Sequence, residues 1–283
     1  MKRTRPMSDG VTTQEAILRD CPRLSLDDTL DFHCGKGLDC FTHCCRDVSI
    51  VLTPYDVIRM KKALHLDSTS FLEKHTLLGC TKDKKLPVVF LKMDSVDRRC
   101  PLVTDEGCSI YAHRPWACRM YPLGLAEPMS PHPEERGFYF IIHEDLCHGY
   151  GTGSQCSIRE WISSQSIDTF EMMGEPFKNL MVNEFWEKGE PLEPRKLEMY
   201  LMACYDLDRF RRFVFETRFT DIFNIDEARL DAIRTDDEEL LVFAMEWLRF
   251  SLFNEKTMKL RPSVMDALEG ADSATAISSE TPR

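Results

Sequence analysis

Residues 100–122 read Cys100-Pro-Leu-Val-Thr-Asp-Glu-Gly-Cys108-Ser-Ile-Tyr-Ala-His-Arg-Pro-Trp-Ala-Cys118-Arg-Met-Tyr-Pro122. The first half of this stretch, Cys100 to Tyr111, predicts a β-hairpin whose turn runs from Thr104 to Gly107. The stretch also carries three cysteines, and thiolates are soft metal ligands. It therefore predicts a compact domain of short strands and helices that wraps a thiolate-rich site.

The other cysteines strengthen this interpretation. The chain has 283 residues and 12 cysteines, and ten of the cysteines lie between Cys34 and Cys156. One further cluster reads Cys34-x5-Cys40-x3-Cys44-Cys45, and another reads Cys147-x8-Cys156. Several thiolates close in sequence select zinc, iron–sulfur clusters or Cu(I) over hard cations. Nine clustered thiols exceed the four ligands of a single mononuclear site.

The adjacent pair Cys44-Cys45 bears on how many metals are bound. Neighbouring side chains in extended backbone point in opposite directions. In such backbone the two thiols are poorly placed to chelate one tetrahedral ion. The pair therefore favours a dinuclear or cluster site over two isolated zinc ribbons.

Composition argues against several other classes of protein. The sequence has no run of about 18 apolar residues that could span a membrane. Lys2, Arg3 and Arg5 are followed by no apolar core, so we expect no secretory signal and a cytoplasmic protein. The cytosol keeps thiols reduced, which disfavours a disulfide scaffold. The net charge of −11 argues against nucleic-acid binding.

The order of patterns along the chain predicts an α+β protein with four segments. We expect a flexible N-terminus over 1–20, a cysteine-cluster metal-binding domain over 21–156, a mainly helical region over 157–262 and a flexible tail over 263–283. Thr53-Pro54 predicts the start of a helix that reaches about His65. Ser68 or Ser70 is expected to cap a second helix that ends at Gly79.

Further elements follow from the same kinds of pattern. Strands are expected over 86–93 and 138–143, and Ser157 to Glu160 forms a capping box at the start of a helix. Apolar residues from Leu197 to Phe213 predict one amphipathic helix, and a similar stripe runs from Leu240 to Ser251. Glycines 149, 151 and 153 predict a tight loop whose N–H groups approach metal-bound sulfurs, rather than a dinucleotide loop.

The stretch 100–122 resembles the signature of the CxxCxxCC cysteine-cluster family (YkgJ-like), to which flagellin lysine-N-methylase proteins are related. The resemblance covers about 34–156 and implies a zinc- or iron-chelating domain. It implies eight metal ligands at the positions that match the family pattern: Cys34, Cys40, Cys44, Cys45, Cys100, Cys108, Cys118 and Cys147.

This sequence departs from the family pattern in three ways. The opening cysteines are spaced by five and three residues, Cys147 is followed by His148 instead of Pro, and Cys156 is an additional cysteine that could replace Cys34 or be a free thiol. Five histidines near the cysteines could each replace a thiolate, and the best placed are His43 and His148; the others are His33, His113 and His143. Cys21, Cys80 and Cys204 are expected to be ordinary buried thiols.

We predict a metal-binding protein whose cysteine cluster carries zinc or iron, with an iron–sulfur cluster as one form of the iron centre. Whether it is an enzyme stays open. One alternative is an iron–sulfur oxidoreductase or a protein-modifying enzyme of the flagellin lysine-N-methylase type. Another is a structural zinc module whose helical region binds a protein partner. Arg114 and Arg119 flank Cys118 and either offset thiolate charge or form structural ion pairs.

Overall fold

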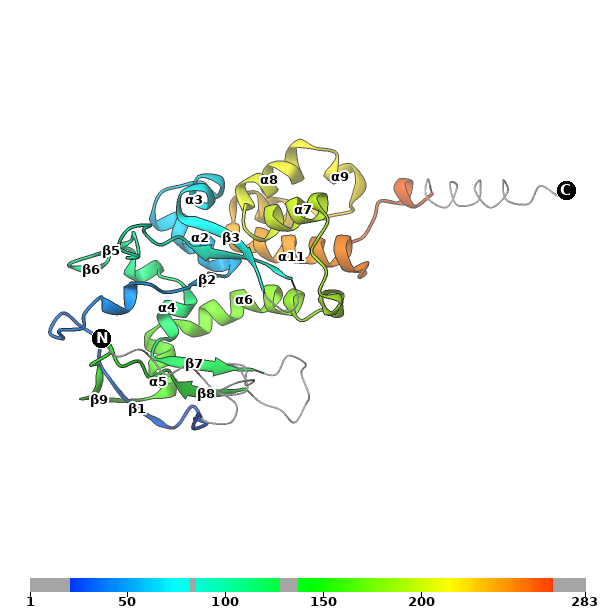
Figure 1. Ribbon diagram of the computed structural model, residues 1–283. Helices are drawn as coiled ribbons and strands as arrows, with labels where there is room; N and C mark the ends of the chain where they lie inside the picture. The colour runs from blue at the N-terminus through cyan, green and yellow to red at the C-terminus, as the bar shows by residue number, and fades with distance from the viewer. Residues whose placement is uncertain (1–20, 82–84, 128–136, 267–283) are drawn as a thin grey trace. The chain divides into compact units, whose positions relative to one another are not determined.

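A computed structural model describes residues 21–81, 85–127 and 137–266 (Figure 1). The expectations for 1–20 and for 267–283 lie outside these residues. Short strands alternate with helices in the first half of the chain and helices dominate the second half, so the predicted α+β class is confirmed. No helix among the described residues is both long and apolar enough to cross a membrane.

The chain divides into two compact units. Unit 1 comprises 1–50 and 93–170, and unit 2 comprises 51–92 and 171–283. Unit 2 includes 51–92 together with the C-terminal helices, and unit 1 continues to residue 170; the predicted division into 21–156 and 157–262 stays a prediction. All nine clustered cysteines fall in unit 1.

Unit 1 is built from short elements. Its strands are β1 (Thr29–Phe32), β5 (Val103–Thr104), β6 (Gly107–Cys108), β7 (Leu123–Ala126), β8 (Phe138–Ile141) and β9 (Tyr150–Ser157). They form three antiparallel pairs, β1–β9, β5–β6 and β7–β8 (Figure 1). Its helical segments are η1 (His43–Cys45), η2 (Tyr111–His113), α4 (Trp116–Met120), α5 (Ile158–Ser164) and the first turn of α6 (Ile167–Met181).

The apolar core of unit 1 lies between its strands and α5. Its buried members are Leu30, Phe32, Met120, Leu123, Ile158, Ile162 and Ile167. Alternate residues of β1 point into this core, as expected for a strand with one buried face. Cys147 and Cys156 are half-buried at its edge.

Unit 2 combines a small sheet with a group of helices. The sheet has the order β2 (Val51–Leu52), β4 (Pro87–Leu91) and β3 (Thr76–Cys80), and all neighbours are antiparallel. The helices are α2 (Pro54–Ala63), α3 (Ser68–His75), the rest of α6, η3 (Glu184–Lys188), α7 (Pro194–Cys204), α8 (Leu207–Glu216), α9 (Phe219–Ile222), α10 (Glu227–Thr235) and α11 (Asp237–Phe253). The helix α11 contacts α2, α7, α8 and α10.

Several predicted elements are confirmed. The hairpin of 100–111, the strands within 86–93 and 138–143, and the helix within 240–251 are all present. Thr53 and Ser157 are the N-caps of α2 and α5, and each completes a capping box with an acidic residue three positions later.

Two predicted helices are wrong in their limits. Asp67, not Ser68 or Ser70, caps α3, which ends at His75, and Gly79 lies in the strand β3. The predicted helix from Leu197 to Phe213 is two helices, α7 and α8, because the backbone of Asp206 leaves the helical region (φ −99°, ψ 63°).

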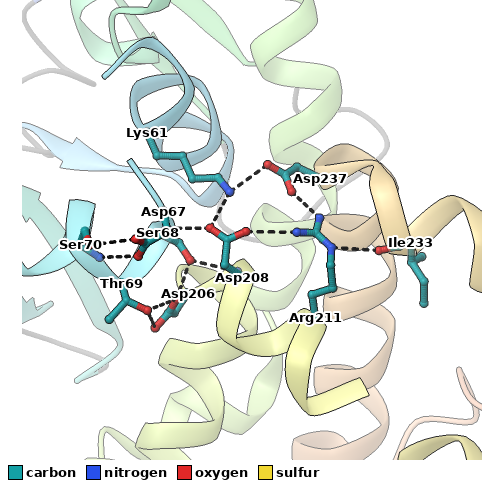
Figure 2. Close-up of polar contacts among 10 residues, drawn as sticks. All are labelled: Lys61, Asp67, Ser68, Thr69, Ser70, Asp206, Asp208, Arg211, Ile233 and Asp237. Carbon is teal, nitrogen blue, oxygen red and sulfur yellow. Dashed lines mark hydrogen bonds and ion pairs between the residues drawn. The ribbon is translucent and has the colours of Figure 1, made fainter. Parts of the chain in front are cut away.

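The break at Asp206 coincides with a polar network in unit 2 (Figure 2). The Asp206 carboxylate accepts hydrogen bonds from the hydroxyls of Ser68 and Thr69. Nearby, the buried Lys61 ammonium lies 2.8 Å from Asp208 Oδ2 and 3.0 Å from Asp237 Oδ2. These contacts tie α2, α3, α8 and α11 together within unit 2.

Candidate metal centre

All 12 cysteines lie among the described residues, and all are free thiols. The disulfide scaffold, which the sequence disfavours, is therefore absent from this part of the chain. Soft ligands are thus available on unit 1 from three separate segments, 34–45, 100–118 and 147.

The first cysteine segment folds as a series of tight turns. Backbone N–H groups donate to carbonyls three residues earlier at Leu38, Phe41, His43 and Cys45, with N···O distances from 2.9 to 3.1 Å. The last of these turns is the 3₁₀ helix η1. Successive turns fold the segment back on itself, so that its thiols gather despite the five- and three-residue spacings.

The 3₁₀ helix changes the prediction for the adjacent cysteines. Cys44 and Cys45 are not in extended backbone, so their side chains are not opposed. Instead the Cys45 thiol hydrogen-bonds to Cys44 and lowers the pKa of Cys44 to about 7. The same contact, with burial, raises the pKa of Cys45. The assumption of opposed side chains was therefore wrong, and the two thiols are close enough to shift each other's pKa.

Cys45 is joined to the hairpin that carries Cys100 and Cys108. The Cys100 N–H donates to the Cys45 carbonyl at 2.8 Å, and Cys108 pairs with Val103 across β5 and β6. Burial raises the pKa of Cys100 overall. Hydrogen bonds from the backbone N–H groups of Leu102 and Val103 act in the opposite direction and lower this pKa. N–H groups directed at sulfur stabilise thiolate, which is the metal-binding form.

Cys34 and Cys40 lie instead beside the segment that carries Cys147. The His33 N–H donates to the Gly149 carbonyl at 2.9 Å, and the His148 N–H donates to Cys40 Sγ at 3.2 Å. Burial raises the pKa of Cys34 to about 11, and the charge of nearby thiols adds to this effect; these thiols are Cys44, Cys147 and Cys40.

The mutual effects on pKa and the backbone hydrogen bonds group the predicted ligands into two neighbourhoods that adjoin at Cys44 and Cys45, although among the described residues no three of these thiols bring their sulfurs within 4.8 Å of one another. One neighbourhood comprises Cys34, Cys40, Cys44 and Cys147. The other comprises Cys45, Cys100, Cys108 and Cys118. Each offers four thiols, the number that a closed zinc site or a four-iron cluster requires.

The two arginines beside Cys118 have different surroundings. The charge of Arg114 lowers the pKa of Cys34 and Cys108, although burial outweighs this effect at both thiols. Arg119 is buried and donates to the backbone carbonyls of Arg114, Gln165 and Ala112 at 2.6–2.9 Å. Arg114 therefore offsets thiolate charge, whereas these contacts of Arg119 hold the backbone around η2 and α5.

The remaining cysteines lie apart from these neighbourhoods. Cys156 is in β9 opposite Leu30, and burial followed by the charge of Glu160 raises its pKa. Cys204 is buried, as expected, but Cys80 is exposed at the end of β3 and Cys21 is half-buried, so the expectation of burial was wrong for these two.

The predicted glycine loop is also different. Gly151 and Gly153 lie within the range of β9 (Tyr150–Ser157), in the break of its register with β1 between Tyr150 and Gln155, and both have positive φ. The Gly153 N–H donates to Asp31 Oδ1 at 3.0 Å rather than to a sulfur. Gly149, just before β9, meets a specific requirement. A Cβ at this position would lie within 3.0 Å of the His33 carbonyl oxygen, so only glycine allows the two backbones to approach this closely.

Among the described residues, one group of three side chains brings metal-ligating atoms within 4.8 Å of one another: Asp39, Cys40 and His148. Sequence analysis named Cys40 and His148 but missed Asp39. The only local signal for Asp39 is its position next to Cys40, because its partner His148 is 109 residues away.

Comparison with known proteins identifies one family. Residues 33–148 match the CxxCxxCC family model, which is described as a "putative zinc- or iron-chelating domain". The match confirms the resemblance, covers less than half of the chain and includes all eight predicted ligands. No curated protein and no solved structure matches the chain. The relation to YkgJ-like and methylase proteins, and with it the enzymatic alternative, stays a prediction.

Proposed function

We propose that the CxxCxxCC segment of this chain binds zinc or iron through its eight clustered thiolates. The observation that supports the proposal is that hydrogen bonds join 34–45 to both other cysteine segments: the Cys100 N–H donates to the Cys45 carbonyl at 2.8 Å, and the His148 N–H donates to Cys40 Sγ at 3.2 Å. Eight gathered thiolates repel one another, and a bound cation offsets that repulsion. Arg114 supplies part of the same compensation.

The local structure around the thiols supports a stabilising role for the metal. Regular structure within 33–50 and 93–118 is limited to η1, β5, β6, η2 and part of α4. Few side chains of these two segments are buried and apolar: Cys40, Leu102, Val103 and Ile110. So small a core supplies little free energy, and structural metal sites contribute folding free energy directly. We therefore assign the centre a structural role in unit 1.

The donor set accommodates either metal. Four thiolates per neighbourhood match a tetrahedral zinc site, and four thiolates also hold a [4Fe–4S] cluster. Both forms need reduced thiols, so we propose that the protein works in a reducing compartment such as the cytoplasm. The predicted protein partner or substrate and the predicted lack of nucleic-acid binding stay predictions.

The test is elemental analysis of anaerobically purified protein, with an absorption spectrum of the same sample. We expect zinc or iron in stoichiometric amounts. A brown protein with iron and acid-labile sulfide identifies an iron–sulfur centre, whereas a colourless protein with zinc alone identifies zinc sites. A protein that contains neither metal, and that takes up neither after reduction, contradicts the proposal.

A further inference from the structure

The exposed edge of the thiol-rich region carries a group of three different donors. Asp39 and Cys40 follow each other in the first cysteine segment, and His148 comes from the segment before β9. The His148 Nδ1 atom lies 2.6 Å from Asp39 Oδ1, and the His148 N–H donates to Cys40 Sγ at 3.2 Å. Ligand atoms of all three residues lie within 4.8 Å of one another.

These distances suit a single small cation. Zinc binds sulfur at about 2.3 Å and nitrogen or oxygen at about 2.0–2.2 Å, so two ligand atoms of one tetrahedral ion lie about 3.3–3.8 Å apart. The 2.6 Å between His148 Nδ1 and Asp39 Oδ1 must therefore widen and the longest separation, up to 4.8 Å, must shorten, which rotations of the two exposed side chains allow. Asp39 is 78% exposed and His148 is 55% exposed, so neither is locked by packing.

The chemistry of the donors narrows the choice of cation. A thiolate and an imidazole disfavour magnesium and calcium, which take oxygen ligands. Sulfur, nitrogen and carboxylate oxygen together are the ligand set of zinc. Three protein ligands, two of them on an exposed surface, leave a fourth position for water, as in zinc sites that exchange ligands.

We propose that Asp39, Cys40 and His148 form an additional, solvent-accessible site for a divalent cation of the zinc type, at the margin of the thiolate centre. The inference rests on the proposed function only through Cys40, whose thiolate serves both sites. The histidine and the carboxylate of the additional site are not among the eight cysteines. The chain can therefore bind one cation more than the two thiol neighbourhoods hold.

The structure provides an anchor for this site. The bond between His33 and the Gly149 carbonyl holds the first cysteine segment against the segment of His148. Cys40 is buried and fixed, while the two exposed ligands can adjust around it. A fixed thiolate with two adjustable partners allows the cation to bind from solvent and to be released to it.

The test is titration of the metal-free, reduced full chain with zinc ions alone, in competition with a chromophoric chelator. His148→Gln should remove one zinc equivalent or weaken one class of site at least about tenfold, and Asp39→Asn should weaken the same class by about 10–100-fold. The matched controls His65→Gln in unit 2 and Asp47→Asn in unit 1 should match the wild type.

Two other outcomes separate the two proposals. If the wild type binds zinc and both His148→Gln and Asp39→Asn bind it with unchanged number and affinity, the additional site is refuted while the thiolate centre stands. If the wild type binds no zinc at all, the proposed function fails and the additional site fails with it. Circular dichroism of each metal-free variant confirms that a loss is not due to unfolding.

Discussion

Replacing Gly149 by alanine tests how the two cysteine-bearing segments are held together. A Cβ at this position would lie within 3.0 Å of the His33 carbonyl oxygen and 2.8 Å from Phe32 Cε2. The first of these atoms belongs to the backbone of the neighbouring segment and cannot rotate away. The two segments must therefore separate, which strains the His33–Gly149 hydrogen bond and the pairing of β1 with β9.

The expected cost follows from the geometry. Overpacking in a buried position costs about 1–3 kcal/mol when the surroundings must shift. With a urea dependence of about 2 kcal/mol per molar, this corresponds to a fall of about 1 M in the unfolding midpoint of unit 1. Because the same separation moves His148 away from Cys40, we also expect weaker zinc binding by Gly149→Ala.

The assay compares Gly149→Ala with Gly37→Ala, both with their metal bound as purified, by urea unfolding followed through circular dichroism. A Cβ added at Gly37 would meet nothing within 4 Å, so its replacement should leave the midpoint within error of the wild type. Equal midpoints for the two variants would refute the argument that the close approach at Gly149 holds these segments together.

Four further predictions concern stability. Lys61→Met should lower the unfolding free energy by about 1–2 kcal/mol, because it removes one of the two cations that pair with Asp208 and Asp237. Arg211 still pairs with both carboxylates, whose exposures of 20% and 27% also keep the cost below that of a fully buried pair. Arg98→Met removes an exposed ion pair and should cost less than about 1 kcal/mol in the same urea assay. Burial acts to raise the pKa of Asp208, but the hydrogen bonds and charge of its partners lower this pKa overall. The contribution of the Asp208 carboxylate to folding stability should therefore be complete above about pH 4 and lost as the pH falls further. Thermal melts at several pH values measure this loss. Ser157→Ala removes a capping box and should cost about 1 kcal/mol in urea unfolding.

Local signals predicted local structure well. Thr53 and Ser157 indicate helix starts because each cap is completed by residues within the next three positions. The hairpin at 100–111 is likewise set by its own turn residues. Such features need no information from distant parts of the chain, so the sequence alone sufficed for them.

The errors share a different cause. Asp206 lies between α7 and α8, and its carboxylate accepts hydrogen bonds from Ser68 and Thr69, which are far away in sequence. An apolar stripe does not reveal such contacts. Cys44 and Cys45 lie in a 3₁₀ helix that ends a series of turns, whereas the prediction assumed extended backbone.

The candidate site shows the same division. The family pattern predicted the eight cysteine ligands, whereas their division into two neighbourhoods follows from the fold. Cys100 and Cys45 are joined by a backbone hydrogen bond between segments that the sequence keeps far apart. Asp39 went unnoticed because an exposed aspartate beside a cysteine carries no signal until His148 is placed next to it.

The central claim is that the clustered thiols of unit 1, and not the cysteines of unit 2, bind the metal. The most direct measurement is the metal content per chain of Cys45→Ser beside Cys80→Ser, both purified without oxygen. Cys45 lies beside Cys44 where the two neighbourhoods adjoin, whereas Cys80 is exposed at the end of β3. We predict that Cys45→Ser loses zinc or iron and that Cys80→Ser retains the wild-type amount. Equal metal content in the two variants would contradict the account.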